Sequence, residues 1–392
     1  MTRRSLMIVT HEFPPLCGGS GSSCARIAEL LSARGWHLIV IVFPEREYAQ
    51  PGKRAEVMCN DSGNTVTMWC RPPPHWSPEV YAAWVKEQIV RAALRYEPAL
   101  IQGFYVGKLA LPTLAAARQR GLPLVASFRG SDVYRDTLLV DGLQRVRTIL
   151  TDAAAVTTVN AESSFILRQC FRTSRRIDVI PNSLSPSVER FITSQTPPRQ
   201  TKQAHIPQRF KLLVSGANRA HKGAATVVEA LPLIKKHLRH VRLTVVGCNS
   251  SEARWLSELG VSTGVSTSLC ILPQFRQDKL WRLTAKASVV VIPSWYEGCP
   301  NVMLEAIRFG RPLVASNVGG MREALEHGHS ARLFASFDHV SLAQEVIWLI
   351  KHPAQAAAQI RKAQQLLTTI FSPRREVHAW ERVYSRTIHQ NK

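Results

Sequence analysis

Short apolar runs rich in β-branched residues alternate with longer helical patterns along the chain, and this alternation limits the possible folds more than any other feature. In the first half, the runs SLMIVT, WHLIVIVF, ALIQGFY and PLVASF have the length and composition of buried strands. Helical patterns separate them, for example residues 22–34 and 78–96. Such alternation is typical of βαβ units that build a parallel sheet.

A proline-rich stretch with weak periodicity divides the alternation into two series. The second series contains the runs FKLLVSG, VRLTVVG, SLCIL, SVVVIPS and RPLVAS. A chain of 392 residues exceeds the usual size of one core, so we expect two α/β domains. The expected organisation is an N-terminal Rossmann-like domain over 1–184, a linker over 185–208, a C-terminal Rossmann-like domain over 209–371, and a helix over 372–392 that returns to the N-terminal domain.

The chain carries a formal net charge of +22. Residues 1–190 contain 23 Lys and Arg against 16 Asp and Glu, and residues 191–392 contain 27 against 12. Such a field favours phosphates, nucleic acid or an anionic membrane surface, although a solvated basic face explains it equally simply. The apolar part of the N-terminus is too short for a signal peptide, and the scattered cysteines fit a reducing compartment. We therefore expect a cytoplasmic protein.

The most informative segment is PSWYEGCPNVMLEAIRFGRPLVASNVGG, residues 293–320. A buried strand leads into a loop that holds Glu297 and Gly298, and the next helix is predicted to begin at Asn301. Ligands of open parallel sheets bind at such strand ends. The backbone N–H groups of Asn301 and Val302, at the start of the helix, favour a phosphate.

Two carboxylates flank this helix start. Glu305 lies one turn beyond Asn301 on the same face of the helix, whereas Glu297 lies in the preceding loop. This arrangement suits a nucleotide sugar, with one carboxylate near the sugar, one near the ribose, and amide groups at the diphosphate. A solvated pair of glutamates is the structural alternative.

This segment resembles the signature of glycosyltransferase family 4, a family of retaining enzymes with the GT-B fold of two facing Rossmann-like domains with parallel sheets. By that resemblance, Glu297 contacts the donor sugar and Glu305 binds the ribose hydroxyls. The downstream residues Asn317 to Gly320 also match the family. The resemblance covers nearly the whole chain. It implies transfer of a sugar from a nucleoside-diphosphate sugar to an acceptor hydroxyl, with no divalent metal.

A second element, SGANRAHKG at residues 215–223, follows a predicted strand. Lysine can neutralise a diphosphate as a point charge, and arginine can bind it through two N–H groups. Lys222 matches the catalytic lysine of the family. The usual arginine of the family is Ala217 here, and Arg219, two positions on, is its expected substitute.

Two loops of the N-terminal half complete the resemblance. In HEFPPLCGGSGSS, residues 11–23, Gly18 and Gly19 match a family loop whose backbone approaches the donor phosphate and the acceptor. In SFRGSDVY, residues 127–134, Arg129 takes the place of a family histidine close to the reacting sugar. Arginine can hydrogen-bond a sugar hydroxyl or an acidic acceptor. Asp132 either orients this loop or contacts the acceptor.

The prediction is a retaining glycosyltransferase of polysaccharide, glycolipid or other glycoconjugate biosynthesis. The donor is a co-substrate, a UDP-sugar in preference to a GDP-sugar, and we expect no cofactor and no metal. The acceptor is a sugar, a lipid-linked molecule or another hydroxyl compound, and the charge adds the hypothesis of peripheral docking on the inner face of an anionic membrane. A GT-B epimerase is the alternative enzyme. Nucleic-acid binding is not expected, because no recognised nucleic-acid-binding motif is present.

Overall fold

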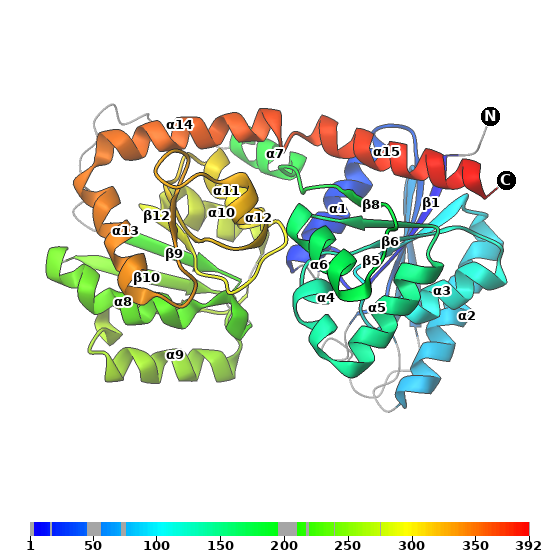
Figure 1. Ribbon diagram of the computed structural model, residues 1–392, viewed down its shortest axis with the longest axis horizontal. Helices are drawn as coiled ribbons and strands as arrows, with labels where there is room; N and C mark the ends of the chain where they lie inside the picture. The colour runs from blue at the N-terminus through cyan, green and yellow to red at the C-terminus, as the bar shows by residue number, and fades with distance from the viewer. Residues whose placement is uncertain are drawn as a thin grey trace. The chain divides into compact units, whose positions relative to one another are not determined.

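The computed structural model describes residues 4–15, 18–44, 56–71, 76–194, 210–216, 219–238, 240–274 and 276–391. The chain forms two compact units, Met1–Pro181 together with Pro373–Lys392, and Asn182–Ser372. Each unit is built on one sheet with helices packed against it (Figure 1).

The N-terminal unit holds an eight-stranded sheet of order β3-β4-β2-β1-β5-β6-β7-β8. Its strands are β1 (Ser5–Thr10), β2 (His37–Val42), β3 (Glu56–Ser62), β4 (Thr65–Arg71), β5 (Leu100–Phe104), β6 (Leu124–Ser127), β7 (Ala155–Thr158) and β8 (Ile177–Val179). The prediction of a parallel sheet is confirmed for all neighbouring pairs except β3 and β4, which are antiparallel. These two strands form a hairpin because Gly63, with φ 64°, turns the chain back between them.

The alternation of side chains along β1 produces two separate cores, one on each face of the sheet. Met7 and Val9 pack on one face with residues of α2, α3 and α5, whereas Leu6 and Ile8 pack on the other with α1 and α15. The helices of this unit are α1 (Gly19–Ser32), α2 (Pro78–Tyr96), α3 (Ala110–Gln119), α4 (Ser131–Tyr134), the 3₁₀ turn η2 (Asp136–Leu138), α5 (Val140–Asp152), α6 (Ala161–Phe171) and α15 (Pro373–Gln390).

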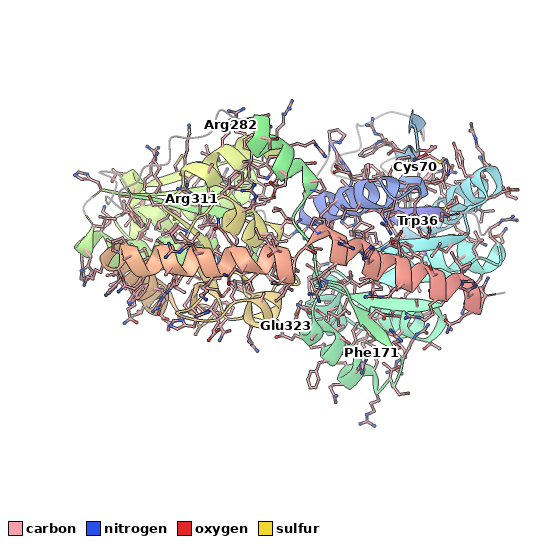
Figure 2. The ribbon with its side chains drawn as sticks, turned by 90° about the horizontal axis from the view of Figure 1, so that it is seen from above. Trp36, Cys70, Phe171, Arg282, Arg311 and Glu323 are labelled. Carbon is pink, nitrogen blue, oxygen red and sulfur yellow. The ribbon has the colours of Figure 1, made fainter. Side chains whose placement is uncertain are left out.

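The C-terminal helix α15 packs on the N-terminal unit through polar contacts as well as apolar ones. The Arg26 guanidinium donates to the Glu376 carboxylate at 2.9 Å, and both side chains are buried. The Tyr384 hydroxyl donates to Gln102 Oε1 at 2.7 Å. Trp36, which Figure 2 shows beside this helix, donates its indole N–H to Glu381. The helix therefore completes the core of a unit that begins more than 350 residues earlier.

The C-terminal unit holds a wholly parallel six-stranded sheet of order β11-β10-β9-β12-β13-β14. Its strands are β9 (Phe210–Ser215), β10 (Val241–Val246), β11 (Leu269–Leu272), β12 (Val289–Ile292), β13 (Leu313–Ser316) and β14 (Arg332–Phe334). Its helices are α7 (Pro186–Ser194), η3 (Ala220–Lys222), α8 (Ala224–His237), α9 (Ser250–Ser262), η4 (Ser266–Ser268), α10 (Gln277–Lys286), α11 (Asn301–Arg308), α12 (Gly319–Ala324), α13 (His339–Lys351) and α14 (Pro353–Thr369). Of the helices that the structure describes, none combines the length and the apolarity needed to cross a bilayer.

The predicted linker is wrong in its first part, where α7 is a helix of the C-terminal unit. Pro186 begins this helix, a position that proline favours because its missing N–H would have no partner there. The ring of Phe191 lies 5.2 Å from that of Trp281, and Arg308 donates to Glu189 at 2.6 Å. The remainder of the predicted linker, from residue 195 on, lies outside the described residues.

Candidate active site

The candidate site of the C-terminal unit lies where the strand order reverses. From β9 the chain passes through α8 to β10 on one side, whereas from β12 it passes through α11 to β13 on the other. The loops that follow β9 and β12 therefore diverge and leave space at the carboxyl ends of these two strands, where open α/β sheets bind ligands. The first loop carries Lys222 and the second carries Glu297.

Lys222 and Glu297 meet in an ion pair. The ammonium group donates to Glu297 Oε1, and the Ser294 hydroxyl donates to the same oxygen at 2.9 Å. The pair is largely buried, with exposed side-chain fractions of 24% and 11%. A glycine permits this approach: Gly223 has φ 67°, and a Cβ atom there would lie 2.0 Å from the Pro293 carbonyl oxygen. No other residue type fits that position without moving the two loops apart.

A third loop fixes the backbone around Glu297. The Gly320 N–H donates to the Glu297 carbonyl at 3.2 Å. A Cβ atom on Gly320 would lie 1.9 Å from the carbonyl oxygen of Gly298, which is buried. The two glycines Gly319 and Gly320 begin α12, so the matching Asn317 to Gly320 segment supports the loop that carries the carboxylate.

Helix α11 begins beside this loop, with Pro300 at its N-cap and Asn301 and Val302 in its first turn. The amide group of Asn182 donates to the Cys299 carbonyl at 2.6 Å and to Asn301 Oδ1 at 3.1 Å. Asn182, which lies outside the segment 293–320, thereby holds the start of α11. The N-terminal end of the helix carries the positive end of its dipole, which favours an anion.

Glu305 is buried in α11 and has a partner that the sequence analysis missed. Gln277, the first residue of α10, donates its side-chain N–H to Glu305 Oε1 at 2.9 Å. The two helices pack against each other, and this packing brings together side chains that are 28 positions apart in the sequence. The sequence shows only that Gln277 follows a predicted strand. That position does not identify Gln277 as a hydrogen-bond partner of Glu305.

Arg219, the expected substitute for the family arginine, is exposed at the N-cap of η3. Its positive charge acts on Glu252 of α9. Burial raises the pKa of the Glu252 carboxyl, and the charge of Arg219 opposes that shift. The charge of Arg219 thus reaches Glu252 of α9, whereas Lys222 is paired with Glu297. Ala217 lies outside the described residues.

In the N-terminal unit the strand order reverses between β1 and β5, and Glu12, which the sequence analysis missed, organises the loop after β1. Its carboxylate accepts from the Gly18 N–H at 3.1 Å, from the Gly21 N–H at 3.1 Å and from the Ser20 hydroxyl at 2.8 Å. The Gly18 N–H therefore already has an acceptor within the protein, the Glu12 carboxylate. Gly19 has open space where a Cβ would lie, so packing does not require a glycine there.

Arg129 and Asp132 follow β6. The Asp132 carboxylate is fully buried and accepts from the backbone N–H groups of Val106, Arg129 and Gly130 at 2.7 to 3.0 Å. Burial raises its pKa to about 6. Because its oxygens hold the loop, we assign Asp132 to positioning, which is one of the two roles that the sequence left open, rather than to contact with the acceptor. The half-buried Arg129 guanidinium lies over the Phe104 ring, 4.6 Å from its centroid.

The arrangement of the strands agrees with that of solved glycosyltransferases. Sucrose-phosphate synthase from Thermosynechococcus elongatus superposes with a TM-score of 0.81 over 99% of this chain and 100% of its own, at 18% sequence identity. The Anabaena protein Alr3699/HepE, solved in complex with UDP-glucose, superposes with a TM-score of 0.74 over 97% and 99% of the two chains, at 18% identity. The fold is GT-B, and the protein is an enzyme of the glycosyltransferase class.

Sequence relatives define the family within that class. The model "Glycosyl transferases group 1" matches residues 209–352, and the model "Glycosyl transferase 4-like domain" matches residues 18–183. Glycogen synthase of Mycobacterium tuberculosis is 24% identical over 97% of this chain and 94% of its own, and 2-deoxystreptamine glucosyltransferase of Streptomyces kanamyceticus is 25% identical over 75% and 79%. The chain belongs to the family-4 type of glycosyltransferases, as the motif around Glu297 and Glu305 predicted. These relatives favour glycosyl transfer over the epimerase alternative.

Proposed function

We propose that the protein transfers a sugar from a UDP-sugar to an acceptor hydroxyl with retention of the anomeric configuration. The observation that carries this proposal is the Lys222–Glu297 ion pair at the point where the strand order reverses. A cation and a carboxylate at that point match the diphosphate and the sugar of the donor. The ammonium group suits the diphosphate, and the carboxylate accepts hydrogen bonds from sugar hydroxyls.

Electrostatic stabilisation of the leaving diphosphate is the proposed source of catalysis. A lysine ammonium has three N–H donors, so Lys222 can keep its bond to Glu297 and also donate to a phosphate oxygen. The backbone N–H groups of Asn301 and Val302 supply further donors. As the bond from the sugar to the diphosphate breaks, negative charge grows on these oxygens and the fixed donors stabilise it.

With Lys222 and the start of α11 at the diphosphate, the proposed reaction needs no divalent metal and no cofactor. The departing phosphate oxygen takes the proton of the acceptor hydroxyl as the sugar passes through an oxocarbenium-like state. Glu305 binds the ribose hydroxyls, held in place by Gln277. Arg219 is a second candidate for the diphosphate. In the N-terminal unit, the loop of Gly18 and Gly19, which Glu12 holds through the Gly18 N–H, is proposed to bring its backbone close to the donor phosphate. Arg129 is proposed to bind a sugar hydroxyl or an acidic acceptor.

The choice of UDP rests on similarity. A protein of the same fold has been solved in complex with UDP-glucose. The relatives named as glycogen synthase and as 2-deoxystreptamine glucosyltransferase favour a glucose-type sugar and a role in polysaccharide or glycoconjugate synthesis. We propose a cytoplasmic enzyme that associates peripherally with the inner face of an anionic membrane when its acceptor is lipid-linked.

Thermal unfolding in the presence of UDP-, GDP-, ADP- and dTDP-sugars tests the donor. A ligand that binds the native state raises the unfolding temperature by mass action, and we expect the largest rise with a UDP-sugar. With an acceptor found, NMR of the product should show the donor's anomeric configuration, and EDTA should leave the rate unchanged. Inversion, or a loss of activity that manganese restores, would contradict the mechanism. Conversion of the donor sugar without any acceptor would instead indicate an epimerase.

A further inference from the structure

Three consecutive apolar side chains are exposed on the N-terminal unit where η2 ends and α5 begins. Leu138, Leu139 and Val140 are 80%, 56% and 82% exposed, and Leu143, one turn into α5, is 39% exposed. We call these four residues the apolar tip. Single exposed apolar residues are common on protein surfaces, but a run of three is unusual unless it has a function.

The backbone beneath the apolar tip is firmly held. The buried Asp136 carboxylate accepts from Arg135 at 2.8 Å and from Arg145 at 3.0 Å. Its carbonyl oxygen lies 1.8 Å from where a Cβ on Gly142 would be, so only glycine allows η2 and α5 to approach this closely. The turn η2 packs against both α4 and α5. The exposure of the tip is therefore a property of a fixed structure.

The local sequence also departs from what stability favours. Leu139 is the N-cap of α5, and no side chain caps the helix there. Ser, Thr, Asp or Asn would satisfy one of the N–H groups of the first turn, whereas leucine cannot. An apolar residue at this position leaves the first turn of α5 without a side-chain cap and exposes its own side chain.

We propose that the apolar tip inserts into the surface of an anionic lipid bilayer and so presents the N-terminal unit to a lipid-linked acceptor. This inference rests on the proposed function, because it selects the lipid-linked class among the acceptors. The tip follows the loop of Arg129 and Asp132 by only a few residues, so membrane docking places that predicted acceptor-side loop close to the bilayer.

Charge and size together identify the occupant as a membrane. The N-terminal unit, with its C-terminal helix, carries 27 Lys and Arg against 17 Asp and Glu, which attracts it to an anionic leaflet. A stable protein partner needs roughly 800 Å² on each side, far more than four side chains on a projecting turn supply. A lipid surface needs no matching pocket, so a few exposed apolar side chains suffice.

Sedimentation with vesicles tests the proposal in the full chain. Wild type should bind vesicles that contain phosphatidylglycerol and bind pure phosphatidylcholine vesicles much more weakly. The uncharged double variant Leu138→Ser/Val140→Ser should lower the partition coefficient for the anionic vesicles at least tenfold. The conservative variant Leu138→Phe/Val140→Ile should bind like wild type. Val261→Ser, at a position that is 70% exposed on α9, is the matched control and should also bind like wild type.

The outcomes separate this proposal from the proposed function. Equal vesicle binding by wild type and by the double serine variant, or no binding by wild type, would overturn the apolar tip as a membrane contact. Wild type could instead self-associate without binding vesicles, and the serine variant could abolish this self-association. That result would make the apolar tip a protein interface. The unfolding temperature with UDP-glucose and without vesicles reports donor binding alone, and the serine variant should retain the wild-type response.

Discussion

At the scale of single residues, the site depends on carboxylates whose oxygens already have partners. Glu297 accepts from Lys222 and Ser294, Glu305 from Gln277, and Asp132 from three backbone N–H groups. The first two are the carboxylates that are proposed to contact the donor. The third is assigned to its own loop, because a fully buried carboxylate with three amide donors is already satisfied.

Glu297→Gln should abolish most of the transfer activity while the fold survives. The amide keeps the shape of the side chain but removes the charge that orients Lys222 and one strong acceptor for the sugar. Loss of one fixed polar contact to a transition state costs about 10² to 10³ in rate. Glu258→Gln removes an exposed carboxylate from α9 and should leave the rate unchanged. Full activity of folded Glu297→Gln would refute the assignment.

Asp132 should make stability depend on pH. Its folded-state pKa of about 6 lies above its ordinary value, so the native state holds a proton that the unfolded chain releases near pH 4. The stability that Asp132 contributes is complete below pH 4 and falls as the pH rises to 6, by about 3 kcal/mol in total. Denaturant unfolding of wild type and Asp132→Asn should show this difference between pH 4 and 7. A constant difference would mean that the pKa is not raised.

At the scale of helices and strands, contacts between distant segments position the functional ones. The start of α10 holds the carboxylate on α11, and α15 closes the core over α1. The return of the last helix to the N-terminal domain was expected from the sequence, but the residue contacts that these helices make do not follow from a local sequence pattern. The periodicity of residues 78–96 predicts α2 with its bounds, because Ser77 caps the helix and Pro78 begins it. Arg26 and Glu376 are 350 positions apart, and only the folded chain brings them together.

Gln277→Ala should weaken UDP binding about fivefold, because a hydrogen bond that orients Glu305 contributes on the order of 1 kcal/mol. The turnover number at saturating donor should stay near that of wild type. Isothermal titration with UDP measures the first quantity and steady-state kinetics the second. Gln365→Ala, an exposed position on α14, is the control. Tighter UDP binding by Gln277→Ala would mean that Gln277 competes with the ribose for Glu305.

Glu376→Gln should lower the free energy of unfolding of the N-terminal unit by about 3 to 5 kcal/mol, because it leaves the Arg26 charge buried without its carboxylate. Arg26→Met/Glu376→Leu should recover most of that loss, since it removes both charges. Glu87→Gln breaks an exposed pair with Arg91 and should cost less than about 0.5 kcal/mol. Denaturant titration followed by circular dichroism measures all three. A small effect of Glu376→Gln would contradict the packing of α15.

At the scale of the whole molecule, the assignment of α15 changes the balance of charge. The halves of the sequence differ in net charge, but the N-terminal unit gains a basic helix and reaches 27 Lys and Arg against 17 Asp and Glu.

Fold class, the family and the donor motif were predictable from the sequence, because strand alternation and the Glu297 to Glu305 spacing are local patterns. Helix α7 was not, because the prolines and polar residues of its segment resemble a loop, and the β3–β4 hairpin was not, because its antiparallel pairing depends on the turn at Gly63. The apolar tip could not be recognised from the sequence, because its recognition depends on the solvent exposure of its side chains.

The most direct test of the central claim is UDP-glucose binding by calorimetric titration to wild type, Lys222→Ala and Lys236→Ala. Both variants remove one lysine from the C-terminal unit, but Lys236 is exposed near the end of α8 whereas Lys222 is paired with Glu297. We predict at least thirtyfold weaker binding by Lys222→Ala, about 2 kcal/mol, and wild-type binding by Lys236→Ala. Equal binding by all three proteins, or no binding by wild type to any nucleotide sugar, would contradict a donor site at the Lys222–Glu297 pair.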